Sequence, residues 1–322
     1  MIFVSDADVR RYVPFEEVLR GVERAFIALH TGASTVFEVV RGRGGGDDHF
    51  FAIKSARDGS IPLLGLKAGS YAPSNRTRGL PAHSSTTLLI DDLTGLPIAL
   101  VEANYLNALR TSAADALAVR ALARTDATTL SIIGIGAQAV FEALAVQHVR
   151  PIRRILAVSR SEERRRPFME ALRERSDISV EFTDAESAAR RADILVTVTP
   201  SQTPLVHADW IRPGTHISAM GADDMGKQEL DVELIARASL WVDHPEQAVR
   251  IGEAQHAFRS GRITLEQLHG CTLGHLLAQP DCYNRSSEDI TVFDSSGIAI
   301  QDIAAAYVAQ RCVVAGRARS EA

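Results

Sequence analysis

The stretch SIIGIGAQAVFEALAV, residues 131–146, decides how this chain folds. A run of β-branched residues, typical of a buried strand, leads directly into Gly134 and Gly136, and a helical pattern begins at Ala137. In such a unit the first glycine permits the tight turn and the second lets the backbone approach a pyrophosphate, while the small Ala139 lets the helix pack closely. The N-terminus of the helix adds N–H donors. The stretch therefore predicts a dinucleotide site in an α/β fold.

The rest of the chain predicts two domains. Short β-branched runs alternate with helical patterns from about residue 127 to residue 242, which is typical of a parallel sheet with helices on its faces. Residues 1–118 instead show an amphipathic helix at 15–29, strand patterns at 49–55, 63–71 and 84–92, and a helix from 104, as in an α+β domain with much antiparallel sheet. We expect the last helix to return to this first domain. The predicted boundaries are residues 1–118 with 296–322, and a Rossmann-type domain of residues 119–295.

The form of the nicotinamide cofactor stays open. An NAD enzyme usually places an acid at the end of the second strand to bind the ribose, whereas this chain has Ser159, Arg160 and Ser161 there. Arginine beside hydroxyls favours a 2′-phosphate, but Glu162 and Glu163 follow at once. We therefore expect NAD(H) or NADP(H).

Composition excludes several other classes of function. The net charge is −5 and no basic stripe is present, so a nucleic-acid partner is not expected. No apolar stretch is long enough for a bilayer and the first residues do not resemble a secretory signal, so we expect no membrane partner and a cytoplasmic location. The three cysteines form no CxxC pair, and no metal site is expected.

Several further segments resemble one family in order and spacing. They are LGLKAGSY (64–71), the long segment from Arg78 to Ala123, GIGAQA (134–139), TVTPS (197–201), SAMGADDMGKQELD (218–231) and VFDSSGIAIQD (292–302). Together they resemble the ornithine cyclodeaminase/mu-crystallin family, which includes cyclodeaminases, alanine dehydrogenases and imino acid reductases. The resemblance implies a homodimer in which the N-terminal domain, with the returning helix, forms the dimer interface and half of the active site.

The resemblance also implies roles for individual residues. Arg43, Lys67 and Arg110 correspond to the family's holders of the substrate carboxylate, and Asp223 to an acid that contacts the substrate amine. Lys67 and Asp223 are therefore the predicted catalytic pair, although Asp223 could instead cap a helix that begins near residues 229–235. The predicted cofactor-binding residues are Arg110, Thr111, Gly134, Gly136, Ala137, Gln138, Ser159, Arg160, Thr199, Met220, Gly221, Lys227 and Ser295.

Two positions depart from the cyclodeaminase pattern. Lys54 stands where cyclodeaminases usually carry an acid facing the substrate's second amine; it suits a second carboxylate, or is a surface lysine on an edge strand. His83 follows Ala82, where a threonine is common, and is a candidate for substrate binding. Arg76 and Arg78 are further cations nearby.

These features favour a reductase of a small α-imino acid, with a dicarboxylate such as iminosuccinate, giving L-aspartate, as the hypothetical substrate. In reverse it would be an amino acid dehydrogenase. The alternatives are an ornithine or other diamino acid cyclodeaminase that releases ammonia, and a non-catalytic, crystallin-like protein that only binds the nucleotide.

Overall fold

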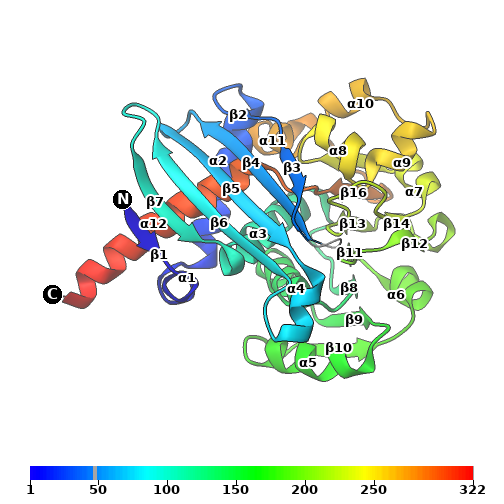
Figure 1. Ribbon diagram of the computed structural model, residues 1–322. Helices are drawn as coiled ribbons and strands as arrows, with labels where there is room; N and C mark the ends of the chain where they lie inside the picture. Colours follow the sequence, from blue (N-terminus) through cyan, green and yellow to red (C-terminus); the bar gives the residue numbers. More distant parts are fainter. Residues whose placement is uncertain (46–48, 322) are drawn as a thin grey trace. The chain divides into compact units, whose positions relative to one another are not determined.

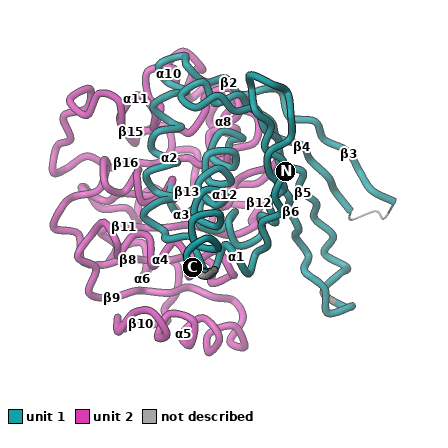
Figure 2. The backbone as a smooth tube through the Cα atoms, turned by 90° about the vertical axis from the view of Figure 1, so that its left-hand side faces the viewer, with its two compact units in different colours: residues 1–113, 298–322 teal, residues 114–297 magenta. Residues whose placement is uncertain are grey.

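The computed structural model describes residues 1–45 and 49–321. The chain divides into two compact units, Met1–Ala113 with Ile298–Ala322 and Ala114–Gly297, coloured teal and magenta in Figure 2. We call them unit 1 and unit 2. The divisions fall at 113/114 and 297/298, against 118/119 and 295/296 expected from the sequence.

Unit 1 is built on a mixed seven-stranded sheet of order β1-β7-β6-β5-β4-β2, with β3 also paired to β4. All described pairs are antiparallel except β1 with β7. The strands are β1 (Ile2–Val4), β2 (Thr35–Val36), β3 (Val40–Arg43), β4 (Phe50–Asp58), β5 (Leu63–Tyr71), β6 (His83–Asp91) and β7 (Pro97–Glu102). The helices are α1 (Asp6–Tyr12), α2 (Phe15–His30) and α12 (Ala299–Glu321), with a 3-10 turn at Pro73–Arg78 in a stretch expected to be loop.

One face of this sheet is covered by helices. Figure 1 shows α12 crossing the strands on the side where α2 lies, and α12 contacts β4, β5 and β6. Along β5 the residues alternate, so that Leu63, Gly65 and Lys67 are buried under this layer. A Cβ on Gly65 would lie 2.9 Å from Cγ1 of Ile303, so glycine permits α12 to approach this closely. The covered face therefore places the first half of β5 against the first turns of α12.

Unit 2 contains a seven-stranded parallel sheet of order β10-β9-β8-β11-β13-β16-β15. Its strands are β8 (Thr129–Ile133), β9 (Arg154–Val158), β10 (Ser179–Phe182), β11 (Ile194–Thr197), β13 (His216–Ala219), β15 (Ser239–Val242) and β16 (Thr291–Asp294); β12 (Gln202–Val206) and β14 (Gln228–Leu230) form a separate pair. The helices are α4 (Ala137–Val149), α5 (Arg165–Arg173), α6 (Ala185–Arg191), α7 (Val232–Arg237), α8 (Pro245–Ile251), α9 (Ala254–Arg259), α10 (Leu265–His269) and α11 (Leu273–Ala278), with 3-10 turns at Glu162–Arg164, Ala208–Trp210 and Pro280–Cys282. Helix α3 (Asn104–Leu122) runs from unit 1 into unit 2.

The order of these strands locates the nucleotide edge. From β8 the chain proceeds to β9 and β10 on one side and then continues with β11 and β13 on the other. Strands β8, β11, β13 and β16 are buried throughout, as expected of central parallel strands. In open parallel sheets ligands bind beyond the carboxyl ends of the strands at such a reversal. We call this side of the unit 2 sheet the carboxyl edge; the predicted nucleotide loop, 134–136, follows β8 there.

Two properties of the described residues bear on other functions. Among the described helices, none combines the length and the apolar character needed to cross a membrane. In the same part of the chain, no three His, Cys, Asp or Glu side chains are grouped so as to hold a metal ion.

Candidate active site

Unit 1 contains a buried cluster of charges around Asp302 in the first part of α12. The Nζ of Lys67 donates to Oδ1 of Asp302 at 2.8 Å and to Oδ1 of Asn107 at 2.9 Å. The Nε of Arg110 lies 2.9 Å from the same oxygen of Asp302. Arg110 also donates to Asn107 at 2.7 Å and to Gln301 at 2.9 Å. One buried carboxylate and two amides thus fix both predicted substrate-binding cations.

Burial and charge set the protonation of this cluster. Burial, with smaller contributions from Arg110 and Lys54, lowers the pKa of Lys67 to about 7, although Asp302 opposes the shift. For Asp302, burial alone would raise the pKa, but Lys67 and Arg110 hold it below its usual value. Lys67 can therefore exchange a proton near neutral pH while Asp302 stays ionised.

The sheet register places the other predicted substrate residues. Lys54 on β4 pairs directly with Lys67 on β5, and cross-strand partners share a face of the sheet. Arg43 belongs to a second row on the same face, in which β3, β4, β5 and β6 contribute Arg43, Phe50, Tyr71 and His83. This row lies four residues from the Lys54 row, or about 14 Å at roughly 3.4 Å per residue.

The structure thus brings Lys54 to Lys67 but sets both Arg43 and His83 apart from the Asp302 cluster. Arg43 and His83 are exposed, and Arg43 ends the short β3. Arg78 is also exposed, whereas the side chain of Arg76 lies outside the described part of the chain. Thr111 is half-buried and its hydroxyl donates to the Asn107 carbonyl at 2.7 Å, within α3.

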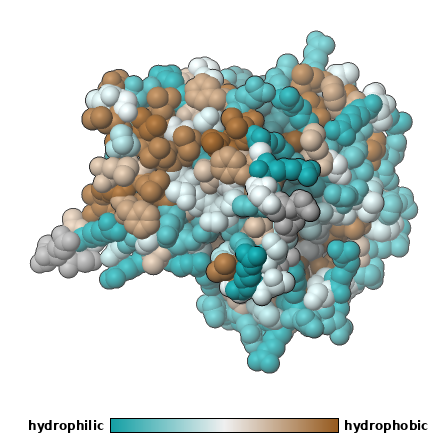
Figure 3. Space-filling view, in the orientation of Figure 1, coloured by the Kyte–Doolittle hydropathy of each residue, from teal (hydrophilic) through white to brown (hydrophobic). Residues whose placement is uncertain are grey.

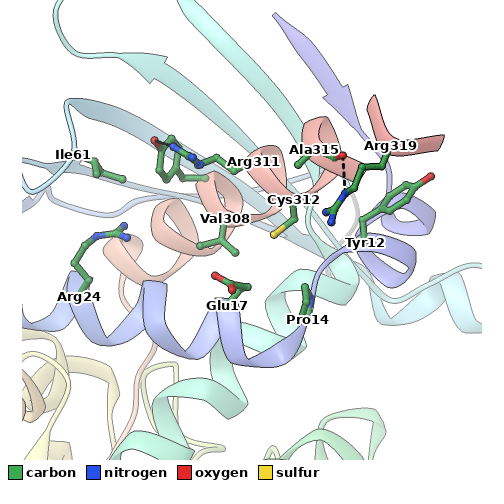
Figure 4. A pocket seen from close by; sticks show the side chains of 11 residues that line it. Tyr12, Pro14, Glu17, Arg24, Ile61, Val308, Arg311, Cys312, Ala315 and Arg319 are labelled. Atoms are coloured by element: carbon green, nitrogen blue, oxygen red, sulfur yellow. Dashed lines mark hydrogen bonds between the residues drawn. The ribbon is translucent and has the colours of Figure 1, made fainter. Parts of the chain in front are cut away.

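A cavity of about 570 Å³ in unit 1 lies between α2 and α12 (Figure 4). Its lining includes Tyr12, Glu17, Arg24, Arg311 and Cys312, and none of the predicted site residues. It is therefore separate from the Asp302 cluster.

In unit 2 the glycine loop has the backbone that its sequence predicts. Gly134 has φ +98°, a conformation that L side chains rarely adopt, and a Cβ there would lie 2.6 Å from Cγ2 of Thr199. Gly136 precedes the first turn of α4, and the space beside it is open. Ala137 and Gln138 begin this helix, with the Gln138 amide donating to Glu142 at 2.7 Å. The open space beside Gly136 would let a phosphate approach the start of α4.

The residues after β9 do not decide between the two cofactors. The Ser159 hydroxyl closes a small turn, donating to the Ser161 carbonyl at 2.9 Å and accepting from its N–H at 3.1 Å. Arg160 is exposed, and Glu162 forms an ion pair with Arg165 at 3.2 Å.

Asp223 and Lys227, predicted to act on the substrate and on the cofactor respectively, form an ion pair with each other. Lys227 also lies 3.4 Å from the Gly221 carbonyl. The alternative interpretation, that Asp223 caps a helix, is wrong: Asp231 caps α7 and accepts from the N–H of Glu233. Asp223 is thus an exposed acid after β13, held by a neighbouring cation.

The remaining residues predicted to bind the cofactor, Met220 and Ser295, lie at the carboxyl edge of the unit 2 sheet. Met220 and Ser295 are buried, and their N–H groups continue the hydrogen bonding of β13 toward β11 and of β16 toward β13. The buried hydroxyl of Ser295 has no hydrogen-bond partner within the described residues.

Sequence reasoning missed Asp302, Asn107, Gln301 and Glu229. Glu229 is fully buried and accepts the N–H groups of Thr199 and Gly221. The only signal for Asp302 and Gln301 was a polar pair within the apolar run of α12, GIAIQDIAAA. Buried polar residues in such a run need partners, but the sequence does not say which.

The chain is similar to known proteins over nearly its whole length. A profile of the ornithine cyclodeaminase/mu-crystallin family matches residues 2–316. Alanine dehydrogenase of Archaeoglobus fulgidus is 36% identical over 312 residues, covering 95% of this chain and 93% of that protein. Iminosuccinate reductase of Paracoccus denitrificans is 34% identical, covering 95% of this chain and 94% of that protein.

Solved structures match over nearly the whole chain. The P. denitrificans iminosuccinate reductase in complex with NAD+ has a TM-score of 0.92 at 33% identity and covers 98% of this chain and 97% of that one. The Δ1-pyrroline-2-carboxylate reductase of Thermococcus litoralis, solved with NADH and L-proline, has a TM-score of 0.93 at 30% identity, with 98% of each chain covered. On sequence and structure, the chain belongs to the ornithine cyclodeaminase/mu-crystallin family.

Proposed function

We propose that this protein is an NAD(P)H-dependent reductase of a small α-imino acid, and in reverse an amino acid dehydrogenase. The observation that carries the proposal is Lys67, buried and with its pKa lowered to about 7, between the anion Asp302 and the cations Arg110 and Lys54. A binding protein needs no proton donor poised near neutral pH, whereas reduction of an imine does.

Unit 2 fits a dinucleotide. The glycine backbone of residues 134–136 and the start of α4 would hold the pyrophosphate, while Thr199, Met220, Gly221 and Ser295 would face the nicotinamide end. The unpartnered buried hydroxyl of Ser295 supports this placement. Bound there, a reduced nicotinamide would supply the hydride for the imine carbon.

The protein's own residues bind the substrate and manage its protons. Arg110 and Lys67 hold the α-carboxylate as a cationic clamp. Lys67 or Asp223 keeps the imine nitrogen protonated, because the iminium is the better hydride acceptor. Asp302 accepts a hydrogen bond from Lys67 and raises its pKa, which keeps Lys67 in place and favours its protonated form.

A dicarboxylate such as iminosuccinate, giving L-aspartate, is the substrate that the charges favour. Lys54, Lys67 and Arg110 are three cations around one buried carboxylate, Asp302. The excess positive charge suits a ligand with two carboxylates and would repel a diamino acid. The iminosuccinate reductase relative supports this choice over ring closure of ornithine.

We also propose a homodimer formed through the uncovered face of the unit 1 sheet. Leu66, Leu88 and Leu100 are aligned across β5, β6 and β7 on this face, and Phe3 on β1 extends the row. The leucines are half-buried and Phe3 is 51% exposed, and Figure 3 shows apolar side chains gathered over these strands. An apolar sheet face of this kind suits a second copy. A neighbouring structure, an archaeal alanine dehydrogenase, is described as a dimer with bound NAD.

The deciding experiment follows the absorbance of reduced nicotinamide while the purified enzyme meets oxaloacetate, pyruvate or glyoxylate with ammonia. A steady loss of this absorbance that is fastest with oxaloacetate and ammonia would support the dicarboxylate reductase. No loss with any oxo acid, but release of ammonia from ornithine or lysine with catalytic NAD, would establish a cyclodeaminase instead. Binding of the nucleotide without either reaction would indicate the crystallin-like alternative.

A further inference from the structure

We infer that Glu229 is a positioning residue, which fixes the loops after β11 and β13 in the geometry that receives the dinucleotide. The inference rests on the proposed function, since it assumes that the carboxyl edge of unit 2 binds the cofactor. Glu229 itself faces these loops and is not expected to touch substrate or cofactor.

A single carboxylate joins the two loops. On β14, Glu229 accepts the Thr199 N–H on Oε1 at 2.7 Å and the Gly221 N–H on Oε2 at 2.9 Å. Thr199 follows β11 and Gly221 follows β13, which are neighbours in the sheet. Carboxylate bonds to backbone N–H groups are among the stronger hydrogen bonds in proteins, so the spacing of the loops depends on this one side chain.

The glycines show how closely these loops are packed. A Cβ on Gly221 would lie 2.4 Å from Oε2 of Glu229 and 2.3 Å from the Thr199 carbonyl oxygen. Thr199 in turn touches the nucleotide loop, because a Cβ on Gly134 would lie 2.6 Å from its Cγ2. Contacts therefore run from Glu229 through Thr199 to the first glycine of the predicted phosphate loop.

Burial makes this arrangement costly. Glu229 is fully buried and has no ion-pair partner in the described part of the chain; burial raises its pKa to about 7 despite the hydrogen bonds from the two loops. A buried carboxyl group costs free energy unless hydrogen bonds compensate for its loss of water. The role of Glu229 is therefore to fix the backbone of the two loops at the carboxyl edge.

The sheet contains a matched control at its opposite edge. Asp193, just before β11, accepts the N–H groups of Thr128 and Thr129 on one oxygen, at 3.0 Å each, and also pairs with Arg124. Both Asp193 and Glu229 thus accept two backbone N–H groups next to β11, although the two that bond to Asp193 belong to one segment. Only Glu229 does so at the carboxyl edge.

The experiment compares Glu229→Gln with Asp193→Asn in the full-length protein. For Glu229→Gln we expect the Kd for NADH, measured by fluorescence titration, to rise about tenfold, because the amide NH₂ would face one of the two N–H groups. The KM for the imino acid at saturating cofactor should stay within about twofold. Asp193→Asn should lower the unfolding temperature and leave the Kd for NADH within about twofold of the wild type.

Each outcome has a distinct meaning. If Glu229→Gln binds NADH as tightly as the wild type, or if Asp193→Asn weakens binding equally, the positioning role is wrong. If the wild-type protein itself binds neither NADH nor NADPH, the proposed function fails first. Should Glu229→Gln not fold, Glu229→Asp tests the same contact. Its carboxylate is one methylene shorter and cannot reach both N–H groups, so NADH binding should again weaken. Wild-type affinity in that variant would overturn the inference.

Discussion

The two units bury carboxyl groups in opposite electrical surroundings. In unit 1, Asp302 lies between Lys67 and Arg110, which hold its pKa below the usual value. In unit 2, burial raises the pKa of Glu229 to about 7 and that of Asp294 to about 8, and it raises the pKa of Glu253 well above normal. The unit 2 acids accept backbone N–H groups in place of cations.

This difference determines what the buried acids of each unit can do. An acid paired with cations stays ionised and can orient and tune them, as Asp302 does for Lys67. Acids surrounded by backbone donors and by one another hold loops in place, and they readily take up protons. We therefore assign the chemistry to the Asp302 cluster and the shaping of the cofactor edge to the carboxyls of unit 2.

The largest expected effect comes from removing the proton donor of unit 1. Lys67→Met keeps much of the side-chain volume but neither the charge nor the proton, so kcat/KM for imine reduction should fall by about 10²–10⁴. Because Lys67 belongs to unit 1, the Kd for NADH should change by no more than about twofold. Equal loss of turnover and cofactor affinity in this variant would show that the two tasks are not divided between the units as proposed.

A smaller effect is expected when the anion beside Lys67 is neutralised. In Asp302→Asn the pKa of Lys67 should fall further, since Asp302 is the group that raises it. If protonated Lys67 supplies the proton, reductase activity should decline with rising pH from a lower pH than in the wild type, with kcat/KM at neutral pH reduced about 10- to 100-fold. A pH profile of kcat/KM that keeps its midpoint while its height falls would contradict this role for Asp302.

The sequence was enough to predict the parts of the fold that depend on local pattern. The glycine loop needs a strand, a tight turn and a helix in immediate succession, and residues 131–146 contain all three. Lys67 could be identified because an ammonium within an apolar strand requires a partner. Its partner, Asp302, lies 235 residues away in the sequence, and no periodicity reports such a contact.

Strand register explains why other contacts could not be predicted from the sequence. Lys54 and Lys67 become neighbours only because β4 and β5 pair in one particular alignment, whereas His83 enters a row four residues away. Glu229 went unnoticed for a similar reason: its contacts reach across two loops, and an acid within KQELD resembles any surface acid.

A third prediction concerns Lys54 and the second carboxylate. Lys54→Met should lower kcat/KM for the imine of oxaloacetate about tenfold relative to that of pyruvate, since one charge contact with the substrate is lost. The matched control is Arg57→Met on the same strand. Arg57 is three residues from Lys54, so it points to the other face of the sheet, where it pairs with Asp92 at 2.7 Å. An unchanged ratio of the two substrates in Lys54→Met would mean that Lys54 does not contact the substrate side chain.

The smallest effect, a difference in stability with pH, tests the comparison itself. The raised pKa values mean that folded unit 2 binds more protons than the unfolded chain between about pH 4 and pH 8, so its stability should fall as the pH rises through 7 and 8. Lys67, whose pKa is lowered to about 7, has the opposite sign: its contribution to unit 1 should improve from about pH 7 to pH 10.

Urea unfolding followed by tryptophan fluorescence can isolate this effect, because both tryptophans, Trp210 and Trp241, belong to unit 2. The control is Asp294→Asn, which keeps an acceptor for the Ala254 N–H, 2.9 Å from the present carboxylate, but carries no ionisable proton. At about pH 8.5 this variant should be more stable than the wild type, by about 1 kcal/mol, with the advantage shrinking toward pH 5. If the urea concentration at the unfolding midpoint of the wild type stays level or rises from pH 6 to pH 8.5, the acids of unit 2 remain ionised throughout. Backbone donors would then stabilise a buried carboxylate as well as the cations of unit 1 do.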